Sequence, residues 1–241
     1  MDEFWGTCPV CGNLGTFKRL NQRTRETFPC ERCRAILRYQ AQAYALVQVY
    51  GRGSAASLVS LASRDWFREL TVYEPGVMGP YRDILRSHPN YFNSFYWDDV
   101  HPGETKDGIQ CQDLHKTTFR DNAFDLIVTS DIFEHIRKPF VAFREIRRIL
   151  KRGGYHIFSI PLTINMPKKT TSRVDTENDE DENILPPVYH GNGIGGQSLV
   201  YTDFGADLFE YLANMGLPTT LSFYSPTDSL PPQLTLISAK I

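Results

Sequence analysis

Four of the five cysteines stand in two close pairs near the start of the chain, Cys8 with Cys11 and Cys30 with Cys33. Each pair is a Cys-x2-Cys turn, and the eighteen residues between the pairs are typical of zinc ribbons and knuckles. Four thiolates form a closed tetrahedral site, so we expect a structural and not a catalytic Zn²⁺. The alternative, two disulfides, is disfavoured because the first residues lack the basic and apolar regions of a signal peptide.

A second set of side chains suited to chemistry follows a short, β-branched apolar run at 124–128. It combines acids and a histidine with a serine: Ser130, Asp131, Glu134 and His135. Such a run predicts a central strand covered on both faces. The run at 124–128 is followed by an amphipathic helical pattern that extends to Arg152 and stops at Gly153-Gly154. A second apolar run comes next, at 155–160. Two strands joined through a helix lie parallel and bind ligands beyond their carboxyl ends, so we expect this set at the mouth of a site.

The rest of the chain supplies the elements that position these residues. Helical spacing occurs at 34–49, 55–67 and 81–86, and after Thr202, which can cap a helix that ends at Gly216. Apolar runs predict further strands at 70–74, 91–96, 108–112, 218–224 and 233–239. The last two flank a Pro-rich turn and predict an antiparallel hairpin, whereas the polar segment 101–108 predicts a loop. The pattern is that of an α/β protein with a doubly wound, mostly parallel sheet.

Length and composition set the organisation. A chain of 241 residues with 41% apolar content can bury a full core. We expect a zinc-binding module at 1–35, linking helices at 36–68 and a main domain at 69–241. The main domain should contain a flexible insertion near 165–195, because the acidic run at 174–184 is typical of a solvated segment. The net charge of −2 gives no general attraction to nucleic acid or anionic membrane. No apolar run approaches the roughly 20 residues of a membrane span, and a cytoplasmic protein is the simplest interpretation.

Three consecutive motifs carry a resemblance to a known family. The run FDLIVTSDIFEHI, the helical pattern ending RRILKRGG and the apolar run ending in Pro161 resemble the fourth strand, the following helix and the fifth strand of class I S-adenosylmethionine-dependent methyltransferases of type 11. The likeness extends from Leu70 to the C terminus and is strongest between Asp113 and Pro161. It implies a Rossmann-like methyltransferase fold with a seven-stranded sheet, to which the zinc ribbon or knuckle is added, and N-terminal helices that roof the cofactor site.

The resemblance also implies an S-adenosylmethionine site. In the family the first strand ends in an acid and a glycine-rich loop, and Glu74, Gly76 and Gly79 match this pattern in part, because the middle glycine is absent. Strand two normally ends in an acid that holds the ribose. That contact stays open among three residues: Ser94, Asp98 and Asp99.

The adenine end of the implied site falls after strand three. There the family places an acid that accepts a hydrogen bond from the adenine amino group, and Asp113 with the backbone amide of Leu114 matches it. The alternative is that Asp113 only caps a turn. Further cofactor contacts are expected at Ser130 and Asp131.

Two histidines compete as the base that an oxygen or carbon acceptor needs. His135 follows strand four, where it can instead begin the next helix and tie loops together. His190, with Tyr189, stands in a Pro- and Gly-rich stretch at 185–193 that resembles a P-x-Y-H-G element over the acceptor pocket of related sequences. The resemblance therefore assigns Tyr189 and His190 to the substrate, and His190 or His135 to catalysis.

The sequence supports methyl transfer to a small-molecule or saccharide acceptor, with S-adenosylmethionine and structural Zn²⁺ bound. One alternative is an RNA methyltransferase, since some rRNA enzymes also carry an N-terminal cysteine knuckle, although the net charge is acidic. Another is a non-catalytic binding protein on a degenerate methyltransferase fold, suggested by the incomplete glycine loop. The methylated atom and the oligomeric state are not specified by these residues.

Overall fold

The computed structural model describes residues 1–191 and 195–241. Its centre is one eight-stranded sheet in the order β15-β16-β8-β7-β3-β4-β6-β5. The parallel strands are β3 (Val72–Pro75), β4 (Tyr91–Phe95), β6 (Ile109–Cys111), β7 (Phe124–Ser130) and β8 (Leu150–Ser159). The reversed strands are β5 (Thr105–Lys106), which pairs with β6, and β16 (Gln233–Ala239), which runs antiparallel to both of its neighbours, β8 and β15 (Thr219–Tyr224). The chain winds outward from β3 to β6, then returns to β7 on the other side of β3, so the predicted doubly wound fold is confirmed.

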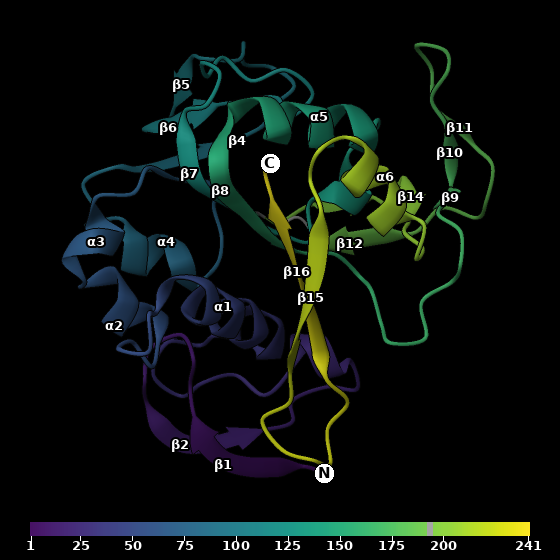
Figure 1. The fold of residues 1–241 in the computed structure, drawn as a ribbon. Helices are drawn as coiled ribbons and strands as arrows, with labels where there is room; N and C mark the ends of the chain where they lie inside the picture. Colours follow the sequence, from purple (N-terminus) through teal and green to yellow (C-terminus); the bar gives the residue numbers. More distant parts are fainter. Residues whose placement is uncertain (192–194) are drawn as a thin grey trace.

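Helices cover both faces of this sheet (Figure 1). Adjacent strand residues point to opposite faces, so Val72 and Leu126 pack on one side while Tyr73 and Ile127 pack on the other. The first side carries α1 (Leu37–Tyr50), α2 (Leu58–Ala62), α3 (Asp65–Arg68) and α4 (Pro80–Leu85). The second side carries α5 (Pro139–Ile149) and α6 (Leu208–Asn214). The central strands β3 and β7 are therefore mostly apolar, because they are buried on both faces.

The structure corrects several predicted boundaries. The helix expected to reach Arg152 ends at Ile149, because the backbone is already extended at Leu150 and Gly153 lies at φ +74 within β8. The helical run 55–67 is split into α2 and α3. Thr202 does not cap a helix; it lies in the two-residue strand β14, and α6 begins six residues later. The segment 101–108, expected to be a loop, contributes β5 as an eighth strand.

The N-terminal 36 residues pack on the sheet through a shared core. The hairpin of β1 (Glu3–Thr7) and β2 (Leu14–Lys18) stacks Phe4 on Phe17, with ring centroids 4.8 Å apart, and Phe28 packs beside them. These rings belong to the same buried cluster as α1 and one face of the sheet. The β15–β16 hairpin extends toward the β1–β2 hairpin (Figure 1).

Helix α1 is fixed to the sheet by a buried glutamine. The Nε2 of Gln42 donates to the carbonyls of Thr129 in β7 and Ile157 in β8, at 2.9 and 3.0 Å. Its Oε1 accepts a hydrogen bond from the Ser130 hydroxyl. One fully buried amide thus joins α1 to the ends of two adjacent parallel strands.

Residues 160–191 and 195–207 leave the sheet and form three small two-stranded ladders. They pair β9 (Thr171–Ser172) with β14 (Thr202–Asp203), β10 (Val174–Asp175) with β11 (Glu182–Asn183), and β12 (Tyr189–Gly191) with β13 (Gln197–Leu199). The last ladder returns the chain to the edge of the sheet where β7 ends. Among the described residues, no helix combines the length and the apolar character needed to cross a membrane.

Candidate functional site

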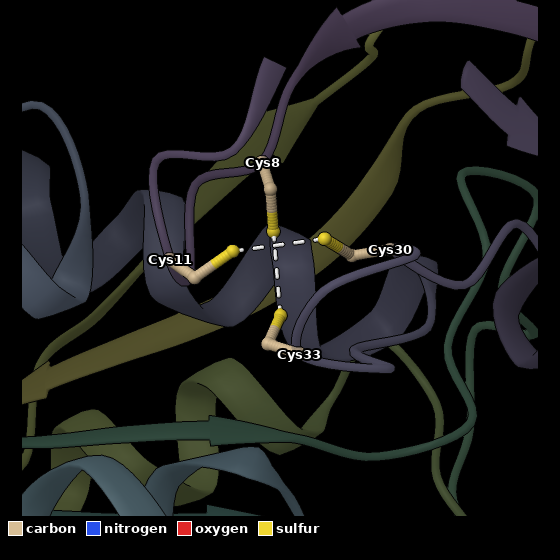
Figure 2. Close-up of side chains that lie close together, drawn as sticks. All are labelled: Cys8, Cys11, Cys30 and Cys33. Carbon is tan, nitrogen blue, oxygen red and sulfur yellow. Dashed lines mark hydrogen bonds between the residues drawn. The ribbon is translucent and has the colours of Figure 1, made fainter. Parts of the chain in front are cut away.

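The four N-terminal cysteine sulfurs converge on one point between two turns (Figure 2). The Sγ of Cys8 lies 3.7 Å from that of Cys33, Cys11 lies 3.6 Å from Cys30, and all four sulfurs are within 4.8 Å of one another. A tetrahedral zinc with Zn–S bonds of about 2.3 Å places its sulfurs about 3.8 Å apart. The thiols are not joined in disulfides. The cluster therefore fits one Zn²⁺ with four protein ligands, as predicted.

The two cysteine turns share one backbone geometry. The amide of Gly12 donates to the Cys8 carbonyl at 2.8 Å, and the amide of Arg34 donates to the Cys30 carbonyl at 2.9 Å. Both donors lie in the left-handed region, at φ +75 for Gly12 and φ +61 for Arg34. A glycine adopts this conformation freely, whereas an arginine carries a cost of about 1 kcal/mol. Sequence spacing predicted the ligands, and the structure adds that one turn is strained.

Ion pairs join the cysteine module to the end of β7. The Nη2 of Arg25, in the short helix η1 (Thr24–Glu26), donates to Asp131 Oδ1 at 2.9 Å, and Nε of Arg38 lies 3.2 Å from Oδ2. Ser159 donates to Oδ1 at 2.8 Å, and Arg38 also pairs with Glu26 at 2.8 Å. Burial works to raise the pKa of Asp131, but the two guanidinium groups outweigh it and lower that pKa. Asp131 itself sits at φ +50, a strained backbone of the kind found at functional sites.

A cavity of about 1420 Å³ lies at the carboxyl ends of the parallel strands. Its walls are the ends of β3, β4, β6 and β7, the η1 segment of the cysteine module, and the β12–β13 ladder. Most ligand pockets measure about 300–1,000 Å³, so this cavity has room for more than one small molecule. Ligands bind at this edge in open parallel sheets. Gly79 does not line the cavity, but most of the residues predicted after β3, β6 and β7 do: Glu74, Gly76, Asp113, Leu114, Ser130, Asp131 and His135.

The loop after β3 lines the cavity at residues 76–78. Gly76 has φ +122, and an added Cβ there would meet no atom within 4 Å, so this loop leaves space beside its backbone. Gly79, at φ +121, packs on Tyr39, whose hydroxyl would lie 2.9 Å from an added Cβ. Glu74 is buried and accepts a hydrogen bond from the Tyr91 hydroxyl at 2.6 Å. Burial raises the pKa of Glu74 to about 7.

Asp113 lies at the cavity in a turn that it stabilises. Its Oδ1 accepts from the backbone amide and the ring Nδ1 of His115, at 2.8 and 2.7 Å. Burial works to raise the pKa of Asp113, but these hydrogen bonds lower it. Both the predicted ligand role and the alternative of a turn acid therefore remain compatible with the geometry, since Oδ2 has no partner among the described residues. Leu114 beside it is 8% exposed.

The residues considered for the ribose differ in their surroundings. Ser94 is buried and hydrogen-bonded to Tyr73 at 2.7 Å, so its hydroxyl is engaged in the core. Asp99 is bound by Lys106 at 2.8 Å and its side chain is 71% exposed. Asp98, which directly precedes Asp99 in the chain, also lines the cavity.

His135 and His190 both line the cavity and contact each other. Their nearest ring nitrogens, Nε2 of His135 and Nδ1 of His190, are 3.2 Å apart, and Nδ1 of His135 bonds the Leu199 carbonyl at 2.8 Å. Burial lowers the pKa of His135. Glu134, in η2 (Phe133–His135), places Oε1 3.8 Å from His135 and 4.0 Å from His190. Burial, with the nearby Asp131, raises the pKa of Glu134.

Tyr189 belongs to the predicted acceptor segment together with His190. Tyr189 is 52% exposed, and it lies outside the cavity lining that includes His190, because adjacent residues of β12 point to opposite sides. Asn192 and Gly193, the end of the predicted stretch, lie outside the described residues.

Two site residues had no assigned role in the sequence. Arg38 lines the cavity, and its Nη1 is buried without a hydrogen-bond partner in the described part of the chain. Glu134 is 0% exposed with both carboxylate oxygens unpaired there. The only available signal for Arg38 was its place at the start of a helix directly after the second cysteine pair.

The strand order, with its reversed last strand and its cavity at the carboxyl edge, defines a class I methyltransferase fold. A family model described as a methyltransferase domain matches residues 98–158, the region around β7, α5 and β8. Residues 98–158 therefore resemble a methyltransferase domain, and a four-cysteine cluster that fits zinc lies near the N terminus of the chain.

Known proteins match parts of the chain. An uncharacterized 37.1 kDa protein in a transposon of Streptomyces fradiae is 28% identical over 95 residues, covering 38% of this chain and 26% of that protein. An uncharacterized methyltransferase of Schizosaccharomyces pombe is 38% identical over 42 residues, 17% of this chain and 15% of that protein. Each match spans about a quarter or less of the length of the curated relative. A solved S-adenosylmethionine-dependent methyltransferase from Mesorhizobium loti aligns with a TM-score of 0.46 and 16% identity, over 71% of this chain and 91% of its own.

Proposed function

We propose that this chain transfers a methyl group from S-adenosylmethionine to a small-molecule or saccharide acceptor. The observation that carries the proposal is one cavity at the carboxyl edge of the sheet that is lined by two chemically different sets of groups. The first set is the Gly76 loop, Arg38 and Asp113, which we assign to a cofactor end, and the second is His135 and His190, which we assign to an acceptor end. A cofactor and an acceptor can therefore occupy the same cavity at the same time.

The first end fits the groups that S-adenosylmethionine presents. The free space beside Gly76 lets a ligand approach the backbone closely. The unpaired Nη1 of Arg38 is a donor suited to the carboxylate of the methionine part. Asp113 would accept from the adenine amino group through Oδ2, and Asp98 is better placed for the ribose than Asp99, which Lys106 already binds.

The second end provides the groups that an acceptor needs. The bound cofactor would supply a methyl group attached to a positively charged sulfur, and this sulfur would become a neutral thioether when the acceptor atom takes the methyl group. A hydroxyl acceptor also gives up its proton, and the pair of imidazoles at His135 and His190 stands where a base can receive it. Alignment in the cavity and exclusion of water would contribute much of the rate.

A calorimetric titration with S-adenosylmethionine tests the cofactor placement. We expect Asp113→Ala to weaken binding about tenfold or more, because it removes a hydrogen bond and a charge from the adenine pocket. Asp99→Ala is the matched control, since this carboxylate lines the same cavity but faces Lys106. Equal affinity of wild type and Asp113→Ala would refute the placement.

The alternatives make different predictions for the same protein. An RNA acceptor would bind with a strong dependence on salt concentration, because phosphate contacts release counterions. A non-catalytic protein would bind no S-adenosylmethionine, or would bind it without releasing S-adenosylhomocysteine for any acceptor. Turnover of a hydroxylated small molecule or saccharide, with affinity that changes little with salt, is the outcome that supports the proposal.

A further inference from the structure

Glu134 is an unusual buried residue because its carboxylate oxygens have no hydrogen-bond partner among the described residues. Its side chain is 1% exposed, and neither Oε1 nor Oε2 has a hydrogen-bond partner among the described residues. A buried carboxyl group without partners costs several kcal/mol unless something compensates it. Its backbone is held firmly, since the Glu134 carbonyl accepts from the Tyr201 amide at 2.7 Å. The backbone at Glu134 is therefore anchored, whereas its carboxylate oxygens have no hydrogen bond from the described residues.

Two imidazole nitrogens lie next to these unused oxygens. Oε1 of Glu134 is 3.8 Å from His135 Nε2 and 4.0 Å from His190 Nδ1, and the two nitrogens are 3.2 Å apart. All three atoms lie within 4.8 Å of one another. Ligands held about 2.1 Å from one ion lie about 3.0–3.5 Å apart, so only small side-chain shifts separate this trio from a coordination shell.

The surroundings of His135 favour a ligand role. Its Nδ1–H donates to the Leu199 carbonyl at 2.8 Å, which leaves the lone pair of Nε2 directed at the trio. Such a hydrogen bond from the remote ring nitrogen fixes the tautomer and orientation of metal-binding histidines. The β12–β13 pairing in turn holds His190 opposite Ser198, so the third ligand also sits on a paired strand.

We propose that Glu134, His135 and His190 bind a divalent transition-metal ion at the acceptor end of the cavity. Two imidazoles and one carboxylate suit ions of the series from Mn²⁺ to Zn²⁺, and three protein ligands leave positions open for other oxygens. This site differs from the cysteine cluster, whose four thiolates close the coordination shell of its ion. The positive charge of the ion would compensate the buried Glu134.

The ion also suggests the acceptor chemistry, a step that rests on the proposed methyl transfer. An acceptor hydroxyl bound at an open position would lose its proton more easily, because a divalent cation lowers the pKa of a coordinated oxygen. With His135 and His190 bound to the ion, neither imidazole serves as the base. The oxygen–methyl bond then forms as the sulfur–methyl bond breaks, and the proton passes to solvent. The acceptor class is thus a hydroxyl compound, with two adjacent oxygens able to fill two open positions.

Mn²⁺ is the probe that separates the two metal sites, because carboxylate and imidazole ligands accept it while thiolates prefer zinc. Titration of the zinc-loaded full chain, followed by the electron paramagnetic resonance signal of free Mn²⁺, should show one bound Mn²⁺ per chain. Glu134→Gln, His135→Ala and His190→Ala should each weaken Mn²⁺ binding at least about tenfold. His115→Ala, which removes another histidine of the same cavity, should bind Mn²⁺ like wild type.

The change in thermal unfolding midpoint on addition of Mn²⁺ gives a second measurement. If Glu134 had only a structural role, its replacement would not alter this Mn²⁺-dependent change. Mn²⁺ should raise the midpoint of wild type and His115→Ala but not that of Glu134→Gln, because only the native trio binds the ion. Absence of Mn²⁺ and Co²⁺ binding beyond the cysteine-bound zinc at millimolar concentrations would overturn the site, as would unchanged binding by Glu134→Gln. Mn²⁺ binding without any S-adenosylmethionine binding would support the site and remove the methyl-transfer proposal.

Discussion

Replacing Asp131 tests whether ion pairs couple the cysteine module to the sheet. Asp131→Asn removes the charge but keeps the size, and asparagine tolerates the left-handed backbone at φ +50. It leaves Arg25 and Arg38, whose side chains are only 21% and 12% exposed, without their shared carboxylate. Two partly buried cations then face each other across an uncharged amide.

The expected magnitude follows from burial. Removing one partner of a fully buried ion pair costs about 3–5 kcal/mol. The side chain of Asp131 is 18% exposed and Arg38 keeps Glu26 as a partner, so we expect Asp131→Asn to lower the free energy of unfolding by about 2 kcal/mol. Asp131→Ala should cost about 3 kcal/mol, since alanine adds strain in the left-handed region.

Urea unfolding of the zinc-loaded protein measures these values, and a double-mutant cycle assigns them. The pair Asp131→Asn and Arg25→Met should show a coupling of about 1 kcal/mol, because both remove the same 2.9 Å hydrogen bond. If the two changes add within about 0.3 kcal/mol, or if Asp131→Asn costs less than about 0.5 kcal/mol, the ion pairs do not hold the module to the sheet.

Three further predictions concern stability. Burial raises the pKa of Glu74 from 4.5 to about 7, so the unfolded chain loses this proton first and the free energy of unfolding falls as pH rises between these values. In urea unfolding, Glu74→Gln should remove this pH dependence and add about 2–3 kcal/mol at pH 8. An unchanged pH dependence would contradict the burial argument. Elemental analysis should find about one zinc per chain in wild type and none in Cys30→Ser, and this variant should have a lower thermal midpoint. A chelator should lower the thermal midpoint of wild type but leave that of the variant unchanged. Arg34→Gly should raise the free energy of unfolding by about 1 kcal/mol, whereas a loss would show that the φ +61 backbone is not strained.

Features with a local sequence signature were predictable. The zinc ligands follow from two Cys-x2-Cys pairs, and the central strands follow from short apolar runs that are buried on both faces. The β15–β16 hairpin lies within one residue of its predicted range, because the Pro-rich turn marks it clearly. The helix end at Ile149 was missed, since the glycines at 153 and 154 indicated a stop although they belong to an irregular part of β8.

Contacts between distant segments were not predictable. Arg25 and Asp131 are 106 residues apart, and His135 and His190 are 55 apart, so no spacing pattern links them. Their meeting depends on how the cysteine module packs on α1 and on the pairing of β12 with β13. The individual roles of Asp113, Ser130 and the other cofactor residues, and the module boundaries at 35 and 68, stay predictions; the module shares its hydrophobic core with the sheet.

The central claim is that the cavity at the carboxyl edge of the sheet binds S-adenosylmethionine beside the Gly76 loop. The most direct measurement is a calorimetric titration of the zinc-loaded full chain, wild type against Gly76→Val, whose side chain would occupy the free space that the glycine leaves. We predict one equivalent bound by wild type and none by a Gly76→Val protein with an unchanged circular dichroism spectrum. Absence of binding by wild type, or equal binding by the folded variant, would contradict the claim.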